Sequence, residues 1–125
     1  MASSDGALRV DLAVPKELGG PGGMATNPEQ LFAAGYAACF ANAMVSSARR
    51  EGSLEDVQGM TVTARAHFGA LGKGRFGLGV TLECDVPALD QAAAEDLVAR
   101  AHERCPYSNA TRGNIDHQFE IKGGS

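Results

Sequence analysis

Three cysteines are the residues in this sequence whose side chains could do chemistry. Cys39 lies in the segment YAACFANAM, Cys84 in LECDV and Cys105 in ERCPY. The cysteines form no CxxC motif, and no pair of histidines has the spacing of zinc ligands. An odd number of cysteines without metal-binding spacing is typical of catalytic thiols in a reducing compartment, which predicts a cytoplasmic protein.

Cys39 and Cys105 belong to segments that predict two inward-facing helical positions. Cys39 lies within an alanine-rich apolar stretch, and Cys105 continues the apolar stripe of a second helix, four residues after Ala101. Two such residues can approach each other, because a disulfide needs a Cα separation of about 5.5 Å. The alternative for each cysteine is that it packs as a small hydrophobic residue.

The expected surroundings of the two thiols differ. Cys105 is expected at a helix C-terminus, where the negative end of the dipole disfavours a thiolate. Cys39 lies inside a helix, so a nearby cation or hydrogen-bond donor is needed to activate it. This asymmetry suits an attacking thiol and a resolving thiol. Cys84, on the apolar face of a predicted strand beside Leu82 and Val86, is expected to be structural.

The longest predicted element is a helix from Pro28 to about Gly52. Asn27 is a good N-cap, Pro28 suits the first turn, and Gln30 stands where a capping-box partner is expected. Nearly every residue from 31 to 45 is apolar or small, which predicts a helix buried on all sides.

Alternating apolar residues predict strands before and after this helix. They lie at 8–14, in a hairpin formed by 60–68 and 76–86, and at 115–121. Asp90 is expected to cap a second helix that Pro106 ends. The order strand, helix, two strands, helix, strand indicates one α+β domain over residues 1–125.

Charge, apolar runs and length restrict what the protein can bind and where it can insert. The net charge of −4 argues against nucleic-acid binding, which requires a basic face. Gly, Asn or Ser interrupts each apolar run, so no membrane span is predicted. The N-terminus lacks the basic and apolar regions of a secretion signal. A domain of 125 residues buries limited surface by itself, which favours a dimer.

Two motifs carry a resemblance to a known family. TNPEQLFAAGYAACF at 26–40 and CPYSNATRGNI at 105–115 closely resemble the signature segments of organic hydroperoxide resistance (Ohr) proteins, a branch of the OsmC/Ohr superfamily. PKELGG at 15–20 is similar to the family's lead-in. The resemblance covers essentially the whole chain and favours the Ohr branch over the osmotically induced branch.

The resemblance implies a thiol-dependent peroxidase that reduces organic hydroperoxides, including lipid-derived ones, in the oxidative stress response. Cys39 matches the peroxidatic cysteine, Cys105 the resolving cysteine and Glu29 the acidic residue of the site. The implied fold is an intertwined homodimer with antiparallel sheets around a buried central helix and sites at the interface. A lipoylated protein or dihydrolipoamide is the implied reductant, with no metal or prosthetic group.

Glu29 precedes Cys39 by ten positions. Along one straight helix that spacing corresponds to about 15 Å, too far for contact. Either the helix breaks, or Glu29 serves Cys39 of the other subunit, which is the reading we favour for a site at a dimer interface. A third possibility is that Glu29 only stabilises the positive end of its own helix.

The chain departs from the family pattern at its N-terminus. The family's site arginine and preceding strand come before the segment that SSDGALRV matches, so both are expected to be missing. No sequence feature places Arg9, Arg65 or Arg75 near Cys39. Arg112 is expected to support the loop after Cys105. The alternatives are therefore an OsmC-type peroxidase of broader specificity, or a redox-sensing or binding module with impaired catalysis.

The remaining expectations concern the histidines and the substrate pocket. The histidines, His67, His102 and His117, are expected to be structural. Apolar walls are expected to favour organic peroxides over hydrogen peroxide, and the candidates are Leu31, Phe32, Tyr36 and Phe40.

Overall fold

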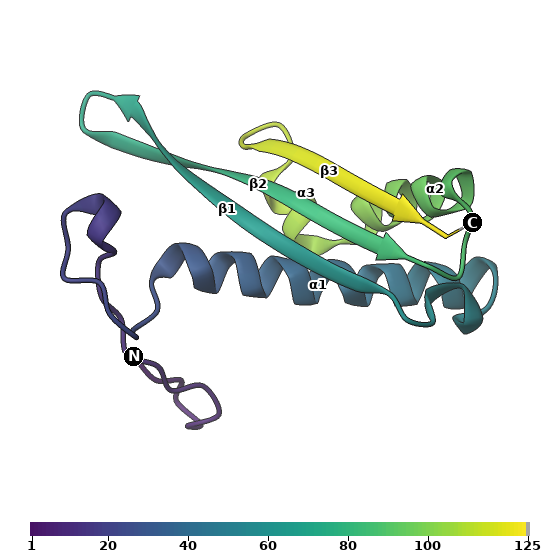
Figure 1. Ribbon diagram of the computed structural model, residues 1–125, viewed down its shortest axis with the longest axis horizontal. Coiled ribbons are helices and arrows are strands. Elements are labelled where there is room, and N and C mark those ends of the chain that lie inside the picture. The colour runs from purple at the N-terminus through teal and green to yellow at the C-terminus, as the bar shows by residue number, and fades with distance from the viewer. Residues whose placement is uncertain (125) are drawn as a thin grey trace.

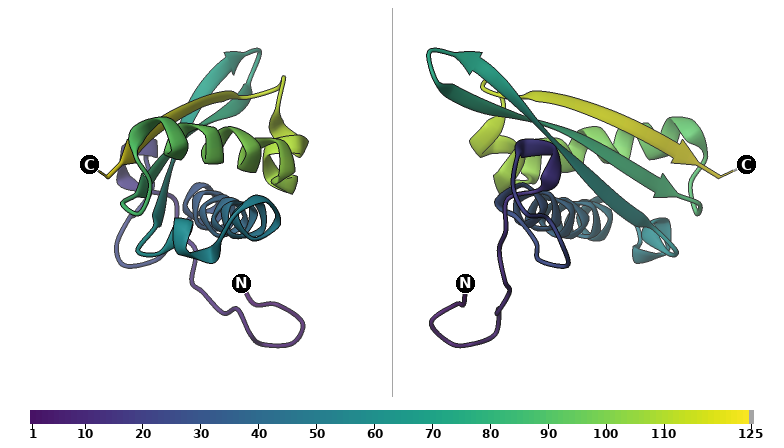
Figure 2. Two further views of the ribbon diagram at one scale, coloured as in Figure 1. Left: turned by 90° about the vertical axis from the view of Figure 1, so that its right-hand side faces the viewer. Right: turned by 60° about the vertical axis from the view of Figure 1, so that its left-hand side comes forward.

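A three-stranded sheet with helices on one face forms the body of the protein. The computed structural model describes residues 1–124. The strands are β1 (Thr61–Gly72), β2 (Arg75–Val86) and β3 (Asp116–Gly123), in the spatial order β1-β2-β3. The helices are α1 (Pro28–Glu51), α2 (Gln91–Arg104) and α3 (Pro106–Thr111), with short 3-10 turns at Lys16–Leu18 and Leu54–Val57. Helix α1 packs beside β1, and α2 lies between α1 and β3 (Figures 1 and 2).

The sheet is mixed, whereas the family resemblance implied antiparallel sheets. β1 and β2 form the expected antiparallel hairpin, with Val62 opposite Cys84. β3 pairs with β2 in parallel, with Cys84 opposite Ile121. The chain reaches β3 through α2 and α3, and a crossover of that length is what parallel pairing requires. The α+β class is confirmed.

Helix α1 begins and ends where the sequence signals predicted. The Asn27 side chain accepts a hydrogen bond from the Gln30 backbone N–H at 2.9 Å, and the helix ends at Gly52. The Gln30 side chain does not close a capping box, because its Oε1 accepts from the Thr26 hydroxyl at 2.6 Å instead. The cap therefore holds the turn before the helix as well as its first residues.

Only one face of α1 is buried within the chain, so the prediction of burial on all sides is wrong for a single copy. Tyr36, Phe40 and Met44 are fully buried, while Ala34 and Ala38 are exposed. The expectation that no run could span a membrane was also too strict. Helix α1 contains a window with a mean hydropathy of 1.3, and by length and composition alone it is long and apolar enough to cross a membrane. Of that apolar window, 33% is buried inside the chain.

Residues 8–14 do not form a strand, contrary to the alternating pattern. They form only isolated bridges, between Ala2 and Arg9 and between Leu12 and Thr26, and the segment extends away from the body (Figure 1). Leu8, Leu12 and Val14 are each between 42% and 52% exposed. An alternating sequence needs a partner strand to complete its hydrogen bonds, and the described residues of this chain provide none.

The core lies between the sheet and the helices. β2 contributes Val80, Leu82, Cys84 and Val86, all at most 1% exposed, and α2 contributes Ala94, Leu97, Val98 and Ala101. The predicted cap of α2 is confirmed, because the Asp90 side chain accepts from the Ala93 backbone N–H at 2.8 Å. Pro106 ends α2 but begins α3, a short helix that the hydrophobic pattern did not indicate.

Candidate active site

Cys39 and Cys105 meet at the contact between α1 and the junction of α2 and α3. Their sulfur atoms are 3.4 Å apart, and both thiols are free. Cys105 is fully buried, whereas Cys39 is partly exposed. A disulfide bond is about 2.0 Å long, so a small approach of the two sulfur atoms is enough to form one.

Burial and a hydrogen bond act on the Cys39 thiol in opposite directions. Desolvation raises its pKa above the ordinary value, and the neighbouring Cys105 thiol raises it further. A backbone hydrogen bond from Tyr107, at the start of α3, acts to lower the pKa, but the net pKa of Cys39 stays raised. The activating cation or donor that the sequence called for is therefore supplied only in part by this backbone amide, among the described residues.

Cys105 occupies two helix ends at once. It is the C-cap of α2, as expected, and also the N-cap of α3. The expectation that only a negative dipole end faces this thiol is therefore incomplete, because the positive end of α3 lies there too. The sequence reading missed this because it treated Pro106 solely as a helix stop, although proline also suits a first helical position.

A cavity of about 550 Å³ opens beside the exposed side of Cys39. Its other lining residues are Asn42, Ala43, Ser46, Arg104 and Pro106. The Arg104 guanidinium, which the sequence reading did not consider, donates to the Ser46 hydroxyl at 2.8 Å. Tyr36 and Phe40, two of the expected apolar walls, are fully buried and do not line this cavity, and neither do Leu31 and Phe32.

Glu29 lies far from Cys39 of its own chain. Helix α1 is continuous from Pro28 to Glu51, so the helix does not break between the two residues. Their ten-residue separation corresponds to about 15 Å. Glu29 instead borders a second cavity of about 580 Å³, whose apolar lining includes Leu12, Val14, Leu18, Phe68 and Phe76.

Comparisons with known proteins agree with this arrangement. Residues 20–120 match the family model described as OsmC-like protein. The chain is 51% identical over 114 residues to the organic hydroperoxide resistance protein of Xanthomonas axonopodis pv. citri, covering 91% of this chain and 79% of that one. This chain belongs to the OsmC/Ohr superfamily, in its Ohr branch.

Further Ohr proteins match along nearly the whole chain. Organic hydroperoxide resistance protein OhrB of Bacillus subtilis is 43% identical over 126 residues, covering 98% of this chain and 88% of that one. The crystal structure of an organic hydroperoxide resistance protein from Legionella pneumophila superposes with a TM-score of 0.89 at 48% identity, covering 97% of this chain and 86% of that one.

This Ohr-branch chain also holds a buried polar network that the sequence reading missed. The Tyr36 hydroxyl lies 2.6 Å from the Ser108 hydroxyl and 3.0 Å from His117 Nε2. His117 Nε2 is also 3.0 Å from the Thr111 hydroxyl. The sequence signal was present, since a tyrosine in an otherwise apolar buried helix needs a partner for its hydroxyl.

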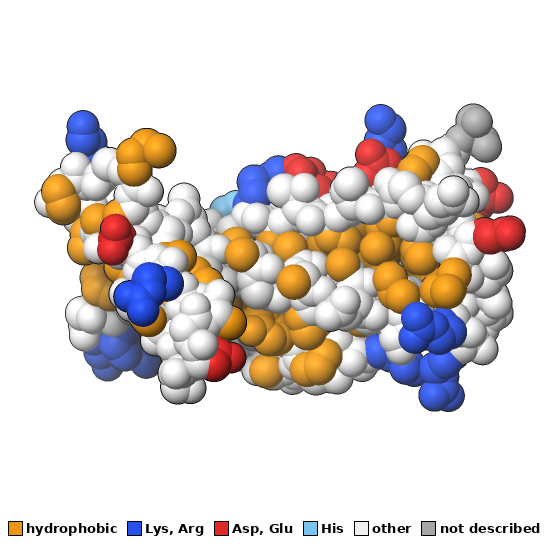
Figure 3. Space-filling view, turned by 90° about the horizontal axis from the view of Figure 1, so that it is seen from below, with side chains coloured by type: hydrophobic (Ala, Val, Ile, Leu, Met, Phe, Trp, Pro, Cys, Tyr) orange, Lys and Arg blue, Asp and Glu red, His pale blue; other side chains and the backbone are white. Residues whose placement is uncertain are grey.

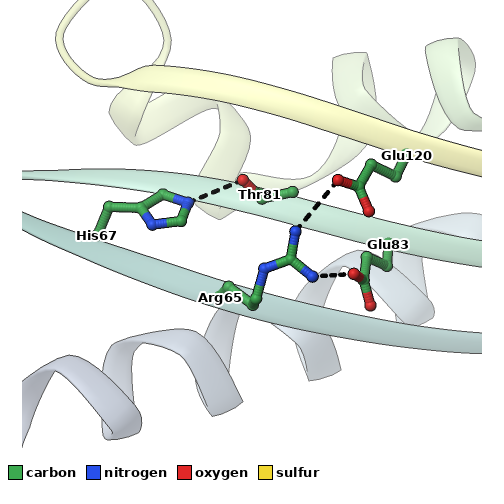
Figure 4. Close-up of polar contacts among 5 residues, drawn as sticks. All are labelled: Arg65, His67, Thr81, Glu83 and Glu120. Atoms are coloured by element: carbon green, nitrogen blue, oxygen red, sulfur yellow. Dashed lines mark hydrogen bonds and ion pairs between the residues drawn. The ribbon is translucent and has the colours of Figure 1, made fainter.

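Two of the arginines named from the sequence are engaged elsewhere. Arg112 donates to the Asn109 side chain at 2.7 Å and to the backbone carbonyl of His102, which supports the loop after Cys105 as expected. Arg65 lies on the outer face of the sheet, with its guanidinium directed to Glu83 and Glu120 (Figure 4). His67 lies on the same face and contacts Thr81 at 2.8 Å (Figure 4).

Cys84 lies in the apolar core on β2. It is 1% exposed, and burial raises the pKa of its thiol to about 12. A thiol with so high a pKa stays protonated near neutral pH and is a poor nucleophile. No cluster that could hold a metal ion occurs within residues 1–124.

Proposed function

We propose that this protein is a cysteine-based peroxidase that reduces organic hydroperoxides, including lipid-derived ones, to alcohols. The observation that carries the proposal is the 3.4 Å separation of the Cys39 and Cys105 sulfur atoms, with Cys39 facing an open cavity. Membership of the Ohr branch and the names of its relatives supply the substrate class.

The reaction begins at Cys39. Its thiolate attacks one peroxide oxygen, so that an S–O bond forms and the O–O bond breaks. The alkoxide leaves with a proton as the alcohol, and Cys39 becomes a sulfenic acid. Cys105 then attacks the Cys39 sulfur, the S–S bond forms and water leaves. A dithiol reductant restores both thiols by exchange, and we assign this role to a lipoylated protein or dihydrolipoamide.

The same proposal includes an intertwined homodimer. Figure 3 shows hydrophobic side chains gathered along the side of the molecule on which α1 lies. The open face of α1 includes Ala34 and Ala38, and the preceding segment exposes Leu12, Val14 and Leu18. A second copy that covers this surface can provide a partner strand for segment 8–14, which forms only isolated bridges within its own chain. It can also bring Glu29 and its apolar cavity against the partner's Cys39.

A steady-state assay separates this function from its alternatives. The protein is mixed with an alkyl hydroperoxide and either dihydrolipoamide or reduced thioredoxin, and loss of peroxide is followed. We expect turnover with the lipoyl dithiol, slower turnover with thioredoxin, and a preference for alkyl hydroperoxides over hydrogen peroxide. Equal use of all peroxides indicates an OsmC-type peroxidase. Formation of the disulfide without turnover indicates a redox sensor. Because free thiols persist in a reducing compartment, we assign the reaction to the cytoplasm.

A further inference from the structure

Tyr36 and Ser108 form a second link between the two segments that carry the cysteines. Tyr36 precedes Cys39 by three residues, and Ser108 follows Cys105 by three residues. Residues three apart in a helix lie on the same side. The 2.6 Å contact of the two hydroxyl groups therefore lies about one helical turn from the 3.4 Å contact of the two sulfur atoms.

This link is buried and supported from β3. Tyr36 and Ser108 are both 0% exposed, so water does not compete for either hydroxyl. Thr111 donates its hydroxyl proton to the Tyr107 carbonyl at 2.7 Å, which leaves its oxygen free to accept from His117 Nε2–H. His117 Nε2 also lies 3.0 Å from the Tyr36 hydroxyl, so this histidine sits between the Tyr36 side chain and the end of α3.

Helix α3 also contacts α1 through the Tyr107 ring, whose centroid lies 5.7 Å from that of the Tyr36 ring. At Gly35, an added Cβ would come within 3.1 Å of the Tyr107 hydroxyl oxygen, so glycine lets the Tyr107 ring lie close to the helix. The helix is only six residues long. Forming the disulfide requires Cys105, at the start of this short helix, to approach Cys39 by more than 1 Å and in the right direction.

We propose that Tyr36 and Ser108 are positioning residues for the resolving step. Their hydroxyl pair holds the start of α3 against α1, so that Cys105 stays within reach once Cys39 is a sulfenic acid. The inference rests on the proposed function, because it concerns the second chemical step of the same cycle. The attack of Cys39 on the peroxide does not use either hydroxyl, so the two steps respond differently to the loss of the pair.

Single-turnover experiments on the reduced protein test this inference. One equivalent of an alkyl hydroperoxide is added without reductant, samples are quenched with an alkylating agent, and mass spectrometry follows the oxidation state of Cys39. Alcohol release reports the first step, and appearance of the Cys39–Cys105 disulfide reports the second. The variants are Tyr36→Phe, which keeps the ring, Ser108→Ala, and the two combined.

We expect each single variant to slow disulfide formation by about fivefold, which corresponds to the loss of one hydrogen bond of about 1 kcal/mol. Alcohol release should change by no more than about threefold, a margin that allows for a weaker Tyr107 contact to Cys39. The combined variant should be no slower than the slower single variant, because both substitutions break the same pair. In the variants, Cys39 sulfinic acid should also accumulate at a lower excess of peroxide than in the parent.

Ser47→Ala is the matched control. Ser47 is a buried serine on α1 whose hydroxyl has no hydrogen-bond partner among the described residues. Its removal should leave disulfide formation unchanged. The inference is overturned if the Tyr36 and Ser108 variants form the disulfide at the parental rate, if both steps slow equally, or if Ser47→Ala slows the second step as much. If the parent protein forms no Cys39–Cys105 disulfide, the proposed function itself fails.

Discussion

Glu29 and Cys39 lie on one uninterrupted helix, ten residues apart. Their side chains cannot meet within a chain, because that spacing corresponds to about 15 Å. Any shared chemistry between them therefore requires a second copy of the protein. Whether Glu29 contributes to the chemistry at Cys39 therefore depends on how two copies assemble, which mixed dimers can test.

We predict that Glu29→Gln lowers peroxide turnover at least about tenfold, since loss of a charge-assisted contact in a site commonly removes 1.4 kcal/mol or more. Mixed dimers of Glu29→Gln with Cys39→Ser should recover about half of the parental activity. In such a dimer one site keeps both native residues and the other loses both. Differently tagged subunits isolate the mixed species, and the two homodimers are the controls. No recovery would show that Glu29 does not act across the interface.

Cys39→Ser should abolish turnover, because a serine hydroxyl cannot become a sulfenic acid. Cys84→Ser should retain turnover and lose stability by about 1–3 kcal/mol, the cost of burying a hydroxyl without a partner. Peroxide consumption and urea unfolding measure the two effects. Residual activity of Cys39→Ser within a few-fold of the parent would contradict the assignment of the attacking thiol.

Cys105→Ser should leave the first oxidation intact and stop the cycle there. One turnover should release one equivalent of alcohol and trap Cys39 as sulfenic acid, and excess peroxide should carry it to sulfinic acid. Mass spectrometry with a sulfenic-acid probe checks this result. If the oxidised parent instead contains an intersubunit disulfide or a disulfide to Cys84, the proposed pairing is wrong.

The Cys84 thiol should make the protein sensitive to alkaline pH. Its folded-state pKa of about 12 lies above the unfolded value of about 8.5, so the folded state holds the proton more tightly. The stability from this group is complete below the unfolded pKa and falls as the pH rises toward the folded one. Between pH 8 and pH 10.5, the free energy of unfolding should fall by up to about 2.5 kcal/mol more in the parent than in Cys84→Ala. Urea titrations under reducing conditions measure these free energies. The same pH dependence in the parent and in Cys84→Ala would contradict the prediction.

The two half-buried histidines should make the protein sensitive to mild acid. Burial, and then the Arg112 charge, lower the pKa values of His102 and His117 below the ordinary value. The unfolded chain therefore binds protons first, and stability is lost as the pH falls below about 6.5. His102→Gln should flatten the decline in stability between pH 7 and pH 5. Urea titrations at each pH measure this slope, and a His102→Gln slope equal to that of the parent would contradict the prediction.

The sequence by itself determined the elements whose causes are local. Asn27 and Asp90 placed the starts of α1 and α2, because a side chain that caps a helix bonds to a backbone N–H three residues away. The alternation of apolar residues located the β1–β2 hairpin and β3, because successive side chains of a strand point to opposite faces of the sheet. The two motifs were enough to indicate the family, which the comparisons show.

The tertiary structure alone decided the relationships between distant segments. Tyr36 and Ser108 are 72 residues apart in the chain, and nothing local indicates that their hydroxyl groups meet in the core. The alternation at 8–14 predicted a strand, but a strand forms only where another strand completes its backbone hydrogen bonds, and within the chain this segment forms only isolated bridges. Likewise, the direction of β3 and the second helix end at Cys105 depend on how α2 and α3 pack back onto the sheet. Local patterns specify elements, whereas the contacts that bring Cys39 and Cys105 together arise only when those elements pack.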